Sequence, residues 1–180
     1  MKRYALLITG ILVSLFCAAQ SEHMKFMGIP LDGTINTFQS KLAAKGLKPD
    51  VQLNRKLEVG VRAFNGSFAG HKADIYVYYD EKTKIVYRAK ACIDSENNNI
   101  AVQTSKTFKS QIEDKYYSQY IINTDTYDGH ESIHYLMLFG VIDLYFSTYT
   151  DAYPTLYCVH IDYYDITNYN KFNNSVMDDL

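Results

Sequence analysis

Apolar and polar side chains alternate over several stretches of this chain, and the alternation predicts antiparallel strands. A period of two places one set of side chains in a core and the other set in solvent, as in a sheet covered on one face. The strands predicted in this way are residues 57–70, 73–80, 84–93, 133–140, 142–149 and 155–163. They form two groups of three, and a polar junction at residues 96–99 separates the groups.

A helical pattern precedes each group of strands. Apolar residues recur at helical spacing in both places, as Ile35, Phe38 and Leu42 and as Phe108, Ile112 and Tyr116. Asp32 or Thr34 is the expected N-cap of the first helix, which Gly46 ends, and Ser105 is the expected cap of the second. Neither apolar stripe is wide, so we expect each helix to pack on a sheet.

Three short sequence matches occur in the same order in both halves, at an offset of about 70 residues. They pair residues 37–42 with 107–112, 74–77 with 143–146, and 91–94 with 159–162. We therefore predict an α+β protein of two helix-plus-antiparallel-meander repeats, with both helices on one face of a shared or adjoining sheet. The predicted units are 24–96 and 100–166, followed by a polar C-terminal tail at 167–180.

The other face of such a sheet would be open, and tyrosines and cations are the side chains that alternation places there. The candidate binding residues are Tyr76, Tyr78, Arg88, Lys90, Tyr145, Tyr149 and His160. Cys92, Ser147 and Cys158 share this face by the same alternation. Tyrosine gives a large contact area at low entropy cost, which suits recognition, although strands favour tyrosine for packing reasons alone.

The first residues read as a secretory signal peptide. Lys2 and Arg3 precede an apolar run at residues 5–16, and the small residues Cys17-Ala18-Ala19 allow cleavage before Gln20. We expect residues 1–19 to be removed and the mature protein to be exported and soluble. An uncleaved N-terminal anchor and lipidation of Cys17 are the alternatives.

The net charge and the number of cysteines exclude some classes of function. The formal net charge is −2, and removal of Lys2 and Arg3 leaves 16 basic against 20 acidic residues. This balance disfavours a sequence-independent nucleic-acid binder and a polybasic membrane-surface protein. The two cysteines of the mature chain, Cys92 and Cys158, do not make a disulfide scaffold, and the sequence leaves open whether they pair.

One segment matches a catalytic motif. His130-Glu131-Ser132-Ile133-His134 fits H-E-x-x-H, which on a helix binds zinc and activates water. The repeat places this segment at the start of the strand predicted at 133–140, and residues four apart on a strand lie about 13 Å apart, too far to share one ion. The sequence also lacks the third zinc ligand at the spacing that this motif requires. His160 or Asp162 could take that place, but nothing in their spacing indicates it. A zinc-dependent hydrolase is therefore the alternative function, not the expected one.

The first unit resembles a group of secreted Bacteroidales proteins of unknown function. The resemblance rests on residues 26–34 (FMGIPLDGT), on 66–70 (GSFAG) and on the strands that follow, and it covers about residues 26–94. The tandem layout is similar to β-lactamase inhibitor protein and to small outer-membrane assembly lipoproteins. Those proteins bind other proteins without catalysis, and no contact residue of theirs transfers to this chain.

Together these observations predict an exported, non-catalytic binding or interaction module. We expect it in the periplasm or at the surface of a Gram-negative bacterium, with a protein of the cell envelope, or a glycan, as partner. We expect no catalytic residue, no metal, no cofactor, no nucleic acid and no integral membrane segment. A glycan binder that uses the tyrosine face is the third possibility.

Overall fold

The computed structural model describes residues 23–127 and 129–177, so the predicted signal peptide lies outside the described residues. The helices are α2 (Ile35–Ala44), α3 (Val51–Asn54), α4 (Asn98–Lys115) and α5 (Ile166–Met177). The strands are β1 (Lys25–Phe26), β2 (Ile29–Pro30), β3 (Lys48–Pro49), β4 (Val61–Phe68), β5 (His71–Tyr79), β6 (Val86–Ser95), β7 (Tyr120–Tyr127), β8 (His130–Met137), β9 (Gly140–Tyr149) and β10 (Leu156–Asp165). No helix among these residues is long and apolar enough to cross a membrane.

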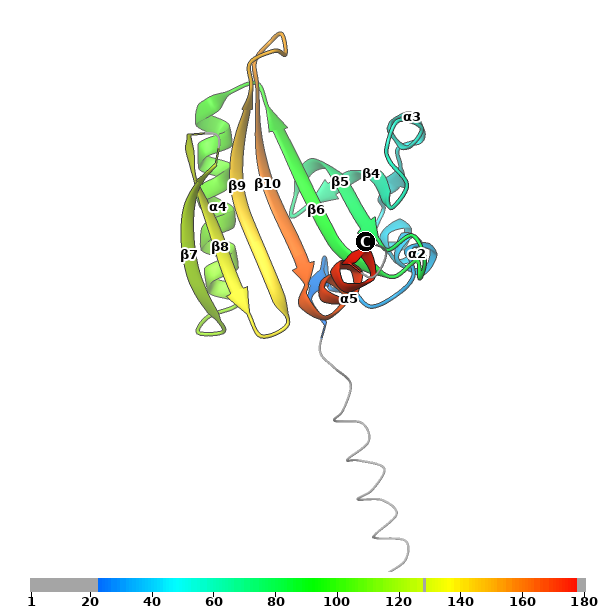
Figure 1. The fold of residues 1–180 in the computed structure, drawn as a ribbon. Helices are drawn as coiled ribbons and strands as arrows, with labels where there is room; N and C mark the ends of the chain where they lie inside the picture. The colour runs from blue at the N-terminus through cyan, green and yellow to red at the C-terminus, as the bar shows by residue number, and fades with distance from the viewer. Residues whose placement is uncertain (1–22, 128, 178–180) are drawn as a thin grey trace, which may run out of the picture.

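An eight-stranded antiparallel sheet forms the centre of the molecule, in the order β3-β4-β5-β6-β10-β9-β8-β7 (Figure 1). Each meander pairs its consecutive strands, and the two meanders join where β6 pairs with β10. In this central pair Cys92 lies opposite His160 and Ala91 lies opposite Ile161. The predicted α+β class is confirmed, while the duplication of the chain stays a prediction.

Both long predicted helices pack on the same face of the sheet. Phe108 of α4 contacts Phe68 of β4, with ring centroids 5.8 Å apart. Arg62, which lies opposite the buried Val77 on this face, donates to Gln39 of α2 over 2.8 Å. The side chains buried between the helices and the sheet include Ile35, Phe38, Leu42, Ile75, Val77, Phe108, Ile112, Leu144 and Ile161. We call this the helix side, and the opposite side the open face.

Helix α4 begins earlier than the sequence suggests. The Asn97 side chain accepts from the backbone N–H of Ile100 over 3.2 Å, so Asn97 is the cap and Ser105 lies inside the helix. Ala101 and Thr104 continue the buried stripe toward the N-terminus. Because these two are small or polar, an apolar pattern starting at Phe108 does not reveal the first turns.

Strand β7 was not predicted, since almost all its side chains are exposed. It is the edge strand of the sheet and pairs with β8 alone. An edge strand with neither face buried needs no alternation, so the periodic signal is missing.

The polar C-terminal tail predicted at 167–180 contains a helix in its described part, α5 (Ile166–Met177). Asp165 is fully buried and accepts from the N–H groups of Met24 and Asn168, each over 2.9 Å. Phe172 stacks on Tyr87 with centroids 4.5 Å apart. Figure 1 shows α4 behind the sheet and α5 in front of it, so α5 covers one end of the open face. The sequence of α5 is polar and gives no sign of these contacts, because they form only when α5 packs on the sheet.

Candidate functional site

The seven candidate binding residues all lie on the open face. Directly opposed residues of paired strands share a face, and the pairs are Tyr76 with Lys90, Tyr78 with Arg88, and Tyr145 with His160. Tyr149 lies opposite Leu156 at the far end of β9 and is 49% exposed. The alternation therefore places the seven residues on the same face.

Arg88 is committed to an internal contact. Its Nε donates to both carboxylate oxygens of the fully buried Asp162, over 3.0 and 3.1 Å. The guanidinium also stacks between Tyr78 and Tyr164, at 4.2 and 4.8 Å from the ring centroids. Burial opposes the charge, yet the hydrogen bonds from Arg88 to Asp162 raise the pKa of the guanidinium overall. Arg88 thus joins β6 to β10 at the centre of the sheet, and its side chain is only partly exposed.

A groove of about 430 Å³ lies on the open face beside α5. Its floor and walls include Tyr76, Tyr78, Tyr87, Lys90 and Phe172. Burial raises the pKa of the Tyr76 phenol to about 12, so the hydroxyl stays protonated and able to donate at neutral pH. The groove therefore offers aromatic surface, hydroxyl donors and one ammonium group in a small space.

His160 lies at the centre of the face, under Tyr145, and is only 4% exposed. The two rings stack with centroids 4.4 Å apart. Its Nε2 is 2.7 Å from the Ser147 hydroxyl, and its Nδ1 is 3.2 Å from the Cys92 sulfur. His160 is therefore too buried to contact a partner at the surface. It belongs instead to a buried polar cluster with Ser147 and Cys92.

Cys92 and Cys158 complete this cluster. Both are free thiols, and the Cys158 sulfur is 3.8 Å from His160 Nδ1. Hydrogen bonding from Cys158 lowers the pKa of the Cys92 thiol, and the same contact raises that of Cys158. Alternation in the sequence places these residues on one face. It does not show that their side chains are in contact, because that depends on the register of β6 against β10.

The H-E-x-x-H segment lies in strand β8 (His130–Met137), which begins before the strand predicted at 133–140. His134 Nδ1 contacts Asp143 over 2.8 Å, whereas His130 Nε2 contacts the hydroxyl of Thr148 over 3.4 Å. Residues four apart on a strand are about 13 Å apart, so these two imidazoles cannot bind one ion. The geometry of the zinc hydrolase motif is therefore not formed.

Asp143 lies directly opposite Asp162, and its ionisation is unfavourable. Burial and the charge of Asp162 raise the pKa of Asp143, despite its hydrogen bond with His134. A raised pKa in the folded state means that protonation of Asp143 stabilises the fold. This contribution is complete below the ordinary value of 3.8 and is lost as the pH rises through the folded-state pKa.

We predict the effect of this linkage on Asp143→Asn. Relative to the wild type, the variant should gain stability as the pH rises from about 4 to about 7, because its side chain cannot ionise. Urea unfolding across this range measures the difference. Asp125→Asn, at an exposed position on β7, is the control and should show no such trend. A difference that moves the other way would show that His134 stabilises the carboxylate more than burial penalises it.

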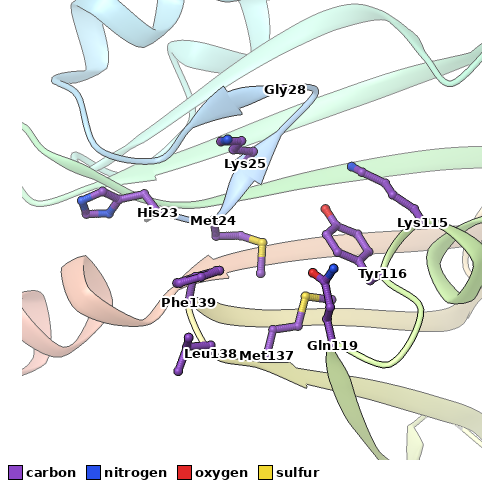
Figure 2. A pocket seen from close by; sticks show the side chains of 10 residues that line it. All are labelled: His23, Met24, Lys25, Gly28, Lys115, Tyr116, Gln119, Met137, Leu138 and Phe139. Carbon is purple, nitrogen blue, oxygen red and sulfur yellow. The ribbon is translucent and has the colours of Figure 1, made fainter. Parts of the chain in front are cut away.

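A cavity of about 670 Å³ lies between the β1–β2 hairpin, the end of α4 and the β8–β9 turn. Figure 2 shows Met24, Tyr116 and Met137 directed into it, beside Leu138 and Phe139. The cavity is mainly apolar and holds none of the candidate residues. The sequence pattern does not indicate this cavity, because its walls come from three separate segments of the chain.

Comparisons with protein families, with curated proteins and with solved structures gave no match to this chain. The resemblance to secreted Bacteroidales proteins therefore stays a prediction.

Proposed function

We propose that this chain is an exported, non-catalytic binding protein that recognises another protein of the cell envelope through the groove on its open face. The support is the groove itself, which Lys90 lines together with the aromatic side chains of Tyr76, Tyr78, Tyr87 and Phe172. The proposed location, the periplasm or surface of a Gram-negative bacterium, rests on the signal-peptide pattern of residues 1–19.

Lys90 is the group that selects the partner. It is half-buried, its ammonium lies 5.4 Å from the Tyr76 ring centroid, and none of the described residues forms an ion pair with it. Asp162, directly opposite, already accepts from Arg88 and Tyr164. A cation held on aromatic surface without a carboxylate attracts one from a partner, and a partly desolvated pair is stronger than an exposed one.

The acidic residues of the groove do not satisfy Lys90. Glu58 and Glu81 also line it, but both are exposed. Exposed charges interact weakly across solvent, so they contribute little to binding or to repulsion. We therefore infer a partner segment in which an Asp or Glu lies next to an apolar side chain, the carboxylate on Lys90 and the apolar group on the tyrosines.

The test is photo-crosslinking in the native envelope. A benzoylphenylalanine at position 76 should capture one protein, and mass spectrometry should map the crosslink to a segment with an acidic residue. Lys90→Glu should weaken this capture at least about tenfold, since it replaces attraction by repulsion.

Two control variants match these changes. The same crosslinker at position 117, an exposed tyrosine after α4, should not capture that protein. Lys106→Glu, on the exposed surface of α4, makes the same charge change and should leave capture intact. Capture by the Lys90→Glu variant as efficient as capture by the wild type would refute the proposal. Capture of a saccharide instead of a protein would show that the groove binds a glycan.

A further inference from the structure

We propose that Cys92, Cys158 and His160 form a zinc-binding site at the centre of the open face. The three residues come from the two strands that join the meanders, Cys92 from β6 and the others from β10. This inference does not rest on the proposed function, because the groove beside α5 uses other side chains.

The spacing of the ligand atoms already suits one ion. The two sulfurs and the imidazole nitrogen all lie within 4.8 Å of one another. The nitrogen is 3.2 Å from the Cys92 sulfur and 3.8 Å from that of Cys158. With Zn–S near 2.3 Å and Zn–N near 2.0 Å, a tetrahedral ion needs sulfur-to-nitrogen separations of about 3.5 Å. Both observed sulfur-to-nitrogen separations are therefore within a few tenths of an ångström of the required value.

The other ring nitrogen of His160 is held as in known zinc sites. Nε2 lies 2.7 Å from the buried Ser147 hydroxyl, and the Tyr145 ring covers the imidazole. When Nε2 donates its proton to this hydroxyl, Nδ1 presents a lone pair to the space between the two sulfurs. A hydrogen bond to the second nitrogen is the usual way in which proteins orient a histidine ligand.

The same register disfavours a disulfide. Cys92 lies opposite His160, and Cys158 lies opposite Asp94, so the two cysteines are diagonal neighbours. Diagonal neighbours on paired strands have Cα atoms about 7–8 Å apart, beyond the usual range for a disulfide. The thiols can therefore remain available for a metal in an oxidising compartment.

The negative charges at and around the three ligands favour a divalent ion over a monovalent one. Two thiolates neutralise Zn²⁺, whereas they would leave a net negative charge around Cu⁺. Asp94, opposite Cys158, and Asp74, opposite Cys92, add further negative charge beside the site. Three protein ligands leave the fourth position of a tetrahedral zinc ion open to water or to a neighbouring carboxylate.

The test uses the reduced, metal-free mature chain with Co²⁺ as a spectroscopic probe and Zn²⁺ as its competitor. The wild type should bind one Co²⁺, with thiolate charge-transfer and tetrahedral absorption bands, and one equivalent of Zn²⁺ should remove both. Zinc should also raise the melting temperature. Cys92→Ala should lose the bands and the thermal shift, and circular dichroism of this variant shows whether it is folded. Ser147→Ala, which keeps all three ligands, should bind about 10–100-fold more weakly.

Matched variants separate this site from other sources of metal binding. His130→Ala and His134→Ala remove the H-E-x-x-H motif and should bind zinc as the wild type does. Lys90→Glu should also keep the zinc, so that failure of the groove and failure of the metal site are distinct. A Cys92–Cys158 disulfide in the purified protein, binding of Cu⁺ without Zn²⁺, or zinc retained by folded Cys92→Ala would overturn the proposal.

Discussion

Replacing Asp162 by alanine should lower the free energy of unfolding by about 3–5 kcal/mol. Asp162 is fully buried and receives hydrogen bonds from Arg88 and from the Tyr164 hydroxyl. Its removal leaves the guanidinium in the middle of the sheet without its hydrogen-bonded carboxylate, and loss of one partner of a buried ion pair is among the most costly changes in a protein. Urea denaturation followed by circular dichroism measures the loss.

A double replacement distinguishes the buried charge from simple loss of packing. Arg88→Met combined with Asp162→Leu removes both charges and should cost less than Asp162→Ala alone, because no ion remains unpaired. Asp125→Ala, an exposed acid on β7, should change stability by less than about 0.5 kcal/mol. If the double variant is the less stable of the two, the ion pair itself stabilises the sheet and our explanation is wrong.

Gly140→Ala should destabilise the protein by about 3 kcal/mol or more, or prevent folding. Gly140 opens β9 and lies opposite Asp165 of β10. A Cβ at this position would lie 1.8 Å from the backbone oxygen of Tyr164 and 3.2 Å from the Met24 side chain. Since a backbone atom cannot rotate away, β9 and β10 would have to separate at the point where α5 begins.

Gly33→Ala is the matched control, because a Cβ there meets nothing closer than 3.8 Å. Its stability should stay within about 0.5 kcal/mol of the wild type. Thermal unfolding of both variants in parallel gives the comparison. A Gly140→Ala protein as stable as the Gly33→Ala protein would show that the two strands can shift without cost.

Where one face is buried, the predicted strands overlap the observed ones, although those at 57–70 and 133–140 differ at both ends from β4 and β8. In β5, Ile75 and Val77 are inaccessible while Tyr76 and Tyr78 between them are partly exposed. Buried and exposed residues alternate along the strand itself, so a short stretch of sequence is enough to assign each side chain to a face. The location of H-E-x-x-H at the start of a strand was predicted from the repeat, and the segment lies in β8.

Elements without that contrast were missed or misplaced. β7 buries neither face, and the first turns of α4 bury Ala101 and Thr104 where a longer apolar residue was sought. α5 is polar in sequence, yet Asn168 is buried and donates to the backbone oxygens of Leu31 and Val86. These contacts join segments far apart in the chain, and local periodicity holds no information about them.

The sequence by itself determined the α+β class, most of the strands and the set of side chains on the open face, because alternation is a local property of the chain. Only the tertiary structure decided which of them meet. The register of β6 against β10 brings Cys92 beside His160, and the placement of α5 turns part of the face into a groove around Lys90. Both depend on pairing between distant segments, where a shift of one residue would turn every side chain of a strand to the other face.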